Sequence, residues 1–184
     1  MITTRIFLFA LCCLGLNVSC GKNEPSRRPT SDQKIKVVTT VAPITSIVEN
    51  VAGDKADVAG IIPEGINSHT FEPIPSDSKL LSNADLIIFN GLDLETPTLN
   101  LARANLKQGA TIYILGENTL KEAEYIFDFS FPKAQGHPNP HLWLNPEYAM
   151  HYAILVRDEL IRHDPKNKPA YEQNAAQLLK KIEA

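Results

Sequence analysis

Two histidines lie in loops whose residue types are suited to holding a metal ion. His69 lies in segment 65–73 (GINSHTFEP), and His141 lies in segment 139–146 (NPHLWLNP). A neutral imidazole is a common ligand of zinc and other borderline divalent ions. Glycine and proline punctuate both segments, and apolar residues follow each histidine and can anchor its loop on a core. We therefore predict a metal site that contains His69 and His141, with Trp143 placed to exclude water.

Sequence spacing alone does not support this site, because the two histidines are far apart along the chain. A single loop histidine is more often a surface residue, so the hypothesis depends on local context. His137 lies four positions before His141 and is either an auxiliary metal ligand or a solvated loop residue. All three cysteines lie within the first twenty residues, which excludes a zinc-thiolate site in the folded part.

The composition is that of an ordinary globular protein. The chain has 184 residues, of which 43% are hydrophobic and 21% charged, with a formal net charge of −3. Neither terminus carries a block of like charge, so binding to nucleic acid through a basic surface is not expected. A metal-dependent hydrolase would need a fixed general base, and no HExxH motif or pair of catalytic carboxylates is visible. We therefore predict a protein that is not an enzyme.

The first twenty residues are typical of an export signal. Arg5 precedes the apolar run 6–16, which is too short to span a bilayer but suits a secretory signal. Cys20 follows a small residue at the end of this region, as in lipoprotein signals whose cysteine is lipidated. Asn17 stands where those signals usually have leucine, which leaves ordinary cleavage as the alternative. We expect a signal peptide at 1–20, a flexible tether at 21–34, and a periplasmic or cell-surface protein anchored through Cys20.

Beyond the tether, apolar runs alternate with amphipathic stretches. Runs rich in β-branched residues predict strands at 35–41, 58–62, 85–89 and 111–115, and the intervening patterns predict helices. This alternation predicts an α/β fold with a parallel four-stranded sheet and helices on both faces. Binding residues in such folds gather at the carboxyl ends of the strands, and we expect each histidine to follow a strand. Alternating aromatic residues at 125–131 predict an additional edge strand.

Several motifs occur in an order that resembles one protein family. They are TTVAPI (39–44), VAGD (51–54), IPEG (62–65), HTFEP (69–73), ADLI (84–87), NGLDLE (90–95) and PHLWLNP (140–146). In this order they resemble the amino-terminal half of the zinc/manganese solute-binding proteins of ATP-driven metal importers, the ZnuA, PsaA and TroA family. The resemblance runs from about residue 35 to the end of the chain.

The resemblance implies roles for individual residues. In that family both matched histidines are metal ligands, which implies that His69 and His141 bind Zn²⁺ or Mn²⁺ as a transported ligand. Glu72, Glu95 and Trp143 match family motifs without being ligands, and the resemblance implies that they support or brace the loops.

The resemblance also implies a lobe rather than a whole receptor. Residues 35–164 correspond to the amino-terminal metal-binding lobe, and 165–184 to the start of the helix that links it to a second lobe. That second lobe, absent here, supplies the other ligands in the family. The helical pattern runs to Ala184 without a capping glycine, so we expect a longer polypeptide.

The functional hypothesis follows from these residues and this resemblance. We predict an exported solute-binding receptor that captures zinc or manganese and delivers it to the transmembrane subunit of an ABC permease. The first alternative is a surface adhesin with a host-surface ligand, because several similar proteins are regarded as adhesins. The second alternative is a truncated, non-functional remnant in which two histidines bind metal weakly.

Overall fold

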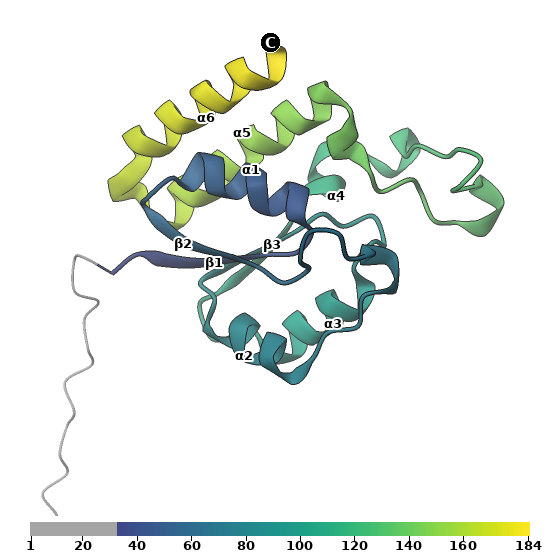
Figure 1. Cartoon of the computed structure of the whole chain (residues 1–184), viewed down its shortest axis with the longest axis horizontal. Helices are drawn as coiled ribbons and strands as arrows, with labels where there is room; N and C mark the ends of the chain where they lie inside the picture. Colours follow the sequence, from purple (N-terminus) through teal and green to yellow (C-terminus); the bar gives the residue numbers. More distant parts are fainter. Residues whose placement is uncertain (1–32) are drawn as a thin grey trace, which may run out of the picture. The chain divides into compact units, whose positions relative to one another are not determined.

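The computed structural model describes residues 33–184, so the predicted signal peptide, Cys20 and most of the predicted tether lie outside the described residues. A parallel sheet of four strands forms the centre of this part of the chain (Figure 1). The strand order is β2-β1-β3-β4, with bounds β1 (Ile35–Thr39), β2 (Ala56–Gly60), β3 (Leu86–Phe89) and β4 (Thr111–Ile114). The predicted parallel four-stranded sheet is therefore confirmed.

The sheet residues explain why these strands are parallel and buried. Every residue of β3 (LIIF) is buried, as expected for a central strand covered on both faces. The regular strands end earlier than predicted, at Thr39 and Gly60. The apolar residues Ile61 and Ile62 nevertheless donate backbone hydrogen bonds to the carbonyls of Thr39 and Thr40, both at 3.0 Å. The predicted runs thus include residues that extend the pairing beyond the strand ends.

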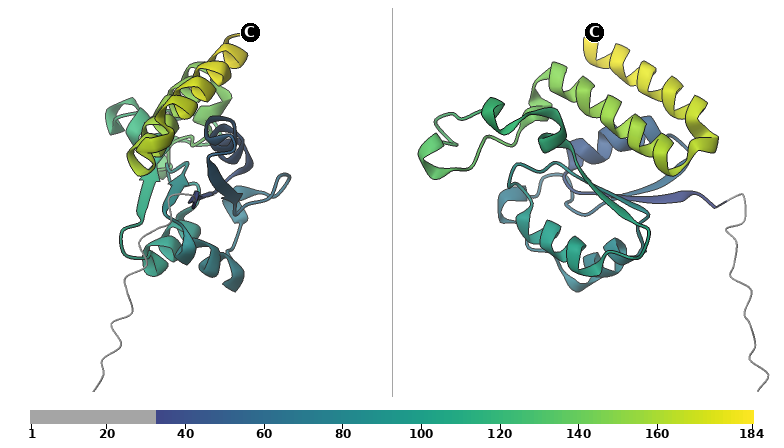
Figure 2. Two further views of the ribbon diagram at one scale, coloured as in Figure 1. Left: turned by 90° about the vertical axis from the view of Figure 1, so that its left-hand side faces the viewer. Right: turned by 180° about the vertical axis from the view of Figure 1, so that it is seen from behind.

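Helices cover both faces of the sheet. The helices α1 (Ala42–Ala52), α5 (Pro146–His163) and α6 (Lys168–Glu183) lie on one face, and α2 (Pro75–Asn83) and α3 (Thr96–Asn105) lie on the other (Figures 1 and 2). Each of the five has a proline at its first or second position. Proline is tolerated there because the first helical turn does not use its N–H groups internally. These prolines therefore mark the starts of the five helices.

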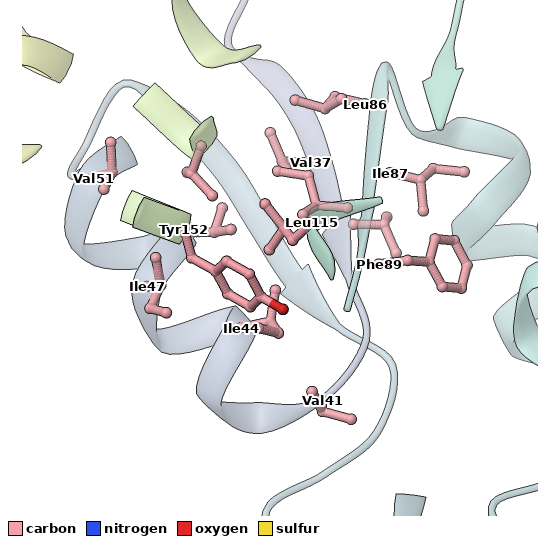
Figure 3. Packing of buried hydrophobic residues seen from close by; sticks show 14 of the residues in the cluster. Val37, Val41, Ile44, Ile47, Val51, Leu86, Ile87, Phe89, Leu115 and Tyr152 are labelled. Carbon is pink, nitrogen blue, oxygen red and sulfur yellow. The ribbon is translucent and has the colours of Figure 1, made fainter. Parts of the chain in front are cut away.

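Part of the hydrophobic core lies between the sheet and the helices α1 and α5. Helix α1 buries Ile44, Val48 and Val51, and helix α5 buries Tyr152. Figure 3 shows the Tyr152 ring among the side chains of Ile44, Ile47 and Leu115. Burial of apolar side chains of this size contributes about 1.5–3 kcal/mol each before entropic costs. This layer is the rigid support for the loops at the carboxyl edge of the sheet.

The predicted edge strand at 125–131 is wrong. The segment between β4 and α5 contains the short helix α4 (Leu115–Thr119), the 3₁₀ turns η2 (Glu122–Glu124) and η3 (Lys133–Gln135), and irregular loop. Its backbone bonds inside the segment, with Asp128 N–H donating to the carbonyl of Phe131 and Asn139 N–H donating to that of Ile126. Prolines in the segment also remove ladder donors. The aromatic alternation therefore does not report a sheet face, and Phe129 is fully exposed.

Helix α6 packs on the helical layer formed by α1 and α5. It buries Tyr171 and Ala175, and the Asn174 side chain donates a 3.1 Å hydrogen bond to the carbonyl of Val51 in α1. The predicted boundary at 165 coincides with the break between α5 and α6, which the 3₁₀ turn η5 (Pro165–Asn167) fills. Its assignment as part of an interlobe helix stays a prediction. Within residues 33–184, no helix is long and apolar enough to cross a membrane.

We expect Tyr171→Phe to lower the free energy of unfolding by about 1–3 kcal/mol, because a buried acceptor loses a donor. The Tyr171 hydroxyl donates a 2.7 Å hydrogen bond to the carboxylate of Asp164, which is only 4% exposed. Urea unfolding followed by circular dichroism measures the loss. The matched control is Tyr148→Phe in α5, whose hydroxyl bonds no residue of the described chain. Equal stabilities of the two variants would contradict this role for the hydroxyl.

Candidate metal centre

The two predicted histidines meet, although their loops are far apart in the sequence. The Nε2 atoms of His69 and His141 lie 3.2 Å apart. Two imidazoles on one tetrahedral zinc ion, each about 2.0–2.1 Å from the metal, place their nitrogens about 3.3–3.4 Å apart. The separation is therefore close to that needed for both nitrogens to bind a single ion.

His69 is presented by a short turn beyond β2. It lies in the 3₁₀ turn η1 (Ser68–Thr70), and Asn67 caps this turn by accepting the His69 N–H at 3.0 Å. Gly65 precedes the turn with a φ of 82°, a conformation that glycine adopts without the strain of a side chain. The loop leaves the carboxyl end of β2, where the α/β pattern places binding residues.

His141 is held differently from the prediction. No strand directly precedes it, since β4 ends at Ile114 and a long loop intervenes, so the expectation that each histidine follows a strand is wrong for His141. His141 is instead the N-cap of the 3₁₀ turn η4 (Leu142–Leu144), which leads into α5. The amide oxygen of Asn139 lies 2.9 Å from the His141 backbone nitrogen and 2.8 Å from its ring Nδ1.

The His141 loop is tied to the core by a buried amide. The Asn90 side chain donates to the carbonyl of Pro140 at 2.9 Å and accepts from the Tyr152 hydroxyl at 3.1 Å. Asn90 and Tyr152 are fully buried, so both hydrogen bonds are shielded from water. Asn139 and Asn90 were missed as site residues by the sequence reasoning. Asn139 lies in segment 139–146, two positions before His141, and Asn90 begins the motif NGLDLE (90–95), which was the available signal.

Aromatic rings surround the imidazole pair. The Trp143 ring meets His141 edge-on, with ring centroids 5.1 Å apart. Its role in excluding water stays a prediction. The ring of Phe131 lies 5.7 Å from that of His69 and 5.5 Å from that of His141. Burial and the neighbouring His69 lower the pKa of His141, while Asp128 opposes this shift. The neutral, metal-binding form of His141 is thereby favoured.

The structure gives the two predicted bracing glutamates different positions. Glu95 is buried and accepts hydrogen bonds from the backbone N–H groups of Asn90 and Gly91, both at 3.0 Å, and from the Thr40 hydroxyl. Glu72 is exposed, and its side chain bonds no residue of segment 33–184. Bracing by Glu95 has a geometric basis, whereas Glu72 has no such contact here.

Glu95 closes a loop with unusual backbone angles. Leu92 and Asp93 have φ values of 53° and 64°, in the left-handed region that non-glycine residues rarely adopt. Such conformations cost on the order of 1–3 kcal/mol each unless the surroundings impose them. The Glu95 carboxylate binds this loop at Asn90 and Gly91, and Glu117 accepts the Leu92 N–H at 3.0 Å. The two carboxylates thus hold the strained turn in place.

His137 lies near the pair but has a different partner. Its Nδ1 is 3.0 Å from a carboxylate oxygen of Asp93, and both side chains are exposed. It lines the same hollow as His69, with a volume of about 440 Å³. Within residues 33–184, no group of three or more His, Cys, Asp or Glu side chains is placed to hold a metal ion. The two converging imidazoles of this part of the chain are those of His69 and His141.

Comparison with known proteins identifies the family of this chain. The family model described as ZnuA, zinc-uptake complex component A periplasmic, matches residues 37–184. The chain belongs to this family. It is 36% identical to the manganese ABC transporter substrate-binding lipoprotein PsaA of Streptococcus pneumoniae, over 98% of this chain and 57% of that protein. The chain thus spans little more than half the length of this relative.

Solved structures share the fold. A Cd-bound periplasmic metal binding protein from Candidatus Liberibacter asiaticus matches with a TM-score of 0.71 and 32% identity, covering 80% of this chain and 52% of that one. The Zn(II)-bound AdcA of Streptococcus pneumoniae matches with a TM-score of 0.68 and 25% identity, covering 82% and 31% respectively. The predicted family and fold are therefore confirmed.

We expect Glu95 to destabilise the fold progressively as pH rises from about 4.5 to about 6. Burial raises the pKa of this carboxyl from its ordinary 4.5 to about 6, against the effect of its hydrogen bonds. Between these values the folded chain keeps a proton that the unfolded chain has lost, so stability falls with increasing pH. A shift of this size corresponds to about 2 kcal/mol.

Comparison of the wild type with Glu95→Gln isolates this contribution, because glutamine does not titrate. Urea unfolding between pH 4 and pH 7 should show the wild type losing stability relative to the variant. The matched control is Glu72→Gln, which makes the same substitution at an exposed position. A flat or rising difference for Glu95→Gln would contradict the assigned shift.

Proposed function

We propose that this chain forms the amino-terminal lobe of an exported receptor that captures a divalent transition metal and delivers it to an ABC permease. The approach of His69 Nε2 to within 3.2 Å of His141 Nε2 carries this proposal, because it offers one ion two ligands. The ion is cargo, bound and released, and no catalytic residues are involved.

The metal is zinc or manganese. Imidazole nitrogens suit zinc, and harder oxygen ligands suit manganese. The relative PsaA is named for manganese, and the AdcA structure contains Zn(II). His69 and His141 contribute two neutral nitrogen ligands, so the remaining ligands determine the preference between the two ions.

Those remaining ligands come from outside the described lobe. A structural zinc site normally has four ligands, and two imidazoles leave the other positions open. We propose that residues 165–184 begin a helix leading to a second lobe that completes the shell. The longer relative PsaA supports this part of the proposal, since the chain covers only 57% of its length.

Export and membrane attachment complete the proposed role. The relative is named as a lipoprotein and the solved neighbour as a periplasmic protein, which supports an exported location. Attachment through Cys20 rests on the sequence of the export signal. We do not extend the proposal to adhesion, because the matched proteins are named for binding and transporting metals.

We expect His69→Ala and His141→Ala each to weaken zinc binding by on the order of 100-fold, because each removes one of the two proposed ligands and a zinc ligand contributes roughly 3 kcal/mol on average. Isothermal titration of the full chain with zinc, and separately with manganese, measures this loss. The matched control is His151→Ala in α5. Equal affinity in all four proteins would contradict the proposed site.

His137→Ala tests the auxiliary role of that histidine in the same titration. Its bond to Asp93 is solvent-exposed, so we expect a change in zinc affinity of less than about fivefold. A loss as large as that of His69→Ala would instead make His137 a principal ligand.

A further inference from the structure

A chain of hydrogen bonds runs from His141 into the loop that precedes it. The His141 Nδ1 lies 2.8 Å from the amide oxygen of Asn139, and the amide nitrogen of Asn139 lies 2.5 Å from Oδ2 of Asp128. The other carboxylate oxygen of Asp128 accepts the N–H groups of Ser130 and Phe131, at 2.8 and 3.0 Å. Carboxylate, amide and imidazole are thus connected in series.

The direction of this series follows from donor chemistry. An ionised carboxylate only accepts hydrogen bonds, and the bond from the Asn139 amide lowers the pKa of Asp128 below its ordinary 3.8. The NH₂ group of Asn139 must therefore face Asp128, and its oxygen must face His141. The backbone N–H of His141, 2.9 Å from the same oxygen, requires the same orientation.

An amide oxygen facing Nδ1 requires that this nitrogen carries the hydrogen. Neutral imidazole has one N–H and one free lone pair, so a hydrogen on Nδ1 leaves the lone pair on Nε2. Nε2 is the atom that lies 3.2 Å from His69. Hydrogen bonds to the distal nitrogen of a metal-binding histidine are known to select its tautomer and fix its ring.

We propose that Asp128 is a positioning residue that acts through Asn139 to hold His141 as the tautomer with hydrogen on Nδ1. The importance of Asp128 for metal capture rests on the proposed function, whereas the assignment of the His141 tautomer does not. The relay also gives the 125–139 loop a role: it carries the carboxylate behind Asn139, and its Phe131 ring packs against both histidines.

The substitution Asp128→Asn removes the carboxylate that fixes the orientation of the Asn139 amide. The new amide can still accept the Ser130 and Phe131 N–H groups through its oxygen, which keeps the loop in place. The NH₂ group of the new side chain at position 128 then faces Asn139. This favours an Asn139 amide rotated so that its oxygen faces position 128 and its NH₂ group faces Nδ1 of His141. A reversed amide requires the hydrogen on Nε2, where it blocks the metal.

The double substitution Asp128→Asn/Asn139→Asp exchanges the two groups and keeps the net charge. The carboxylate then accepts directly from Nδ1 and the His141 backbone N–H, and the new amide behind it donates to the carboxylate. Every hydrogen bond of the relay can be formed again. The double variant should therefore restore what the single variant loses.

Long-range ¹H–¹⁵N correlation spectra of the full ¹⁵N-labelled, metal-free chain at pH 8 report the tautomer of each histidine ring. His141→Gln assigns the signal. We expect the Nδ1–H form in the wild type, an increased Nε2–H fraction in Asp128→Asn, and the Nδ1–H form again in the double variant. Zinc titration should show a loss of about 10–100-fold for the single variant and recovery in the double variant. The matched control is Asp77→Asn in α2, where the Asp77 carboxylate accepts the Ile74 N–H. This variant should change neither the His141 tautomer nor the zinc affinity.

The Nε2–H form in the wild type, or an unchanged tautomer in Asp128→Asn, would overturn the proposal. A double variant that behaves like the single variant would also overturn it, because the effect would then follow from disrupting the loop. Failure of the proposed function gives a different result. If the wild type binds neither zinc nor manganese but shows the expected tautomers, the relay is supported and the receptor function is contradicted.

Discussion

The approach of the two imidazoles depends on the buried side chain of Asn90. Asn90 follows the central strand β3, and through Pro140 and Tyr152 it connects that strand to the His141 loop and to helix α5. Local structure does not by itself bring the long segment between β4 and α5 back to the carboxyl edge of β2. A shielded hydrogen bond to the backbone of this segment does, because leaving the Asn90 amide unpaired in the core would cost about 1–3 kcal/mol.

The second requirement is that the turn after β3 keeps its shape. Glu95 reaches back from the start of α3 to the N–H groups of Asn90 and Gly91. Burying a carboxylate is unfavourable, and burial raises the pKa of Glu95. The strained φ angles of Leu92 and Asp93 are also unfavourable. The buried carboxylate and the strained backbone thus lower the stability of the turn that holds Asn90, and through Asn90 the His141 loop, in position.

The sequence predicts the sheet well because its information is local. The run 86–89 (LIIF) contains only residues suited to a buried strand, and proline lies at the start of α1, α2, α3, α5 and α6. The two histidines could be predicted because their motifs resemble a family. The positions of Asn139 and Asp128 could not, since their roles depend on how the 125–139 loop folds back on itself. The same loop misled the strand prediction, because the aromatic alternation at 125–131 reflects Phe131 turned toward the histidines and Phe129 turned to solvent.

The relay has a consequence for the charge at the site. Asn139 is neutral, and Ser68 and Asn145 also place no charge beside the histidines. The carboxylate of Asp128 does not bond the imidazole directly. It bonds the amide of Asn139, and that amide bonds His141. A directly bonded carboxylate would make the imidazole more basic and increase its affinity for both a proton and a metal ion. An amide instead fixes the orientation with less added basicity. Residues 33–184 therefore orient two neutral nitrogens, and in the proposed receptor the other ligands would have to neutralise the charge of a divalent ion.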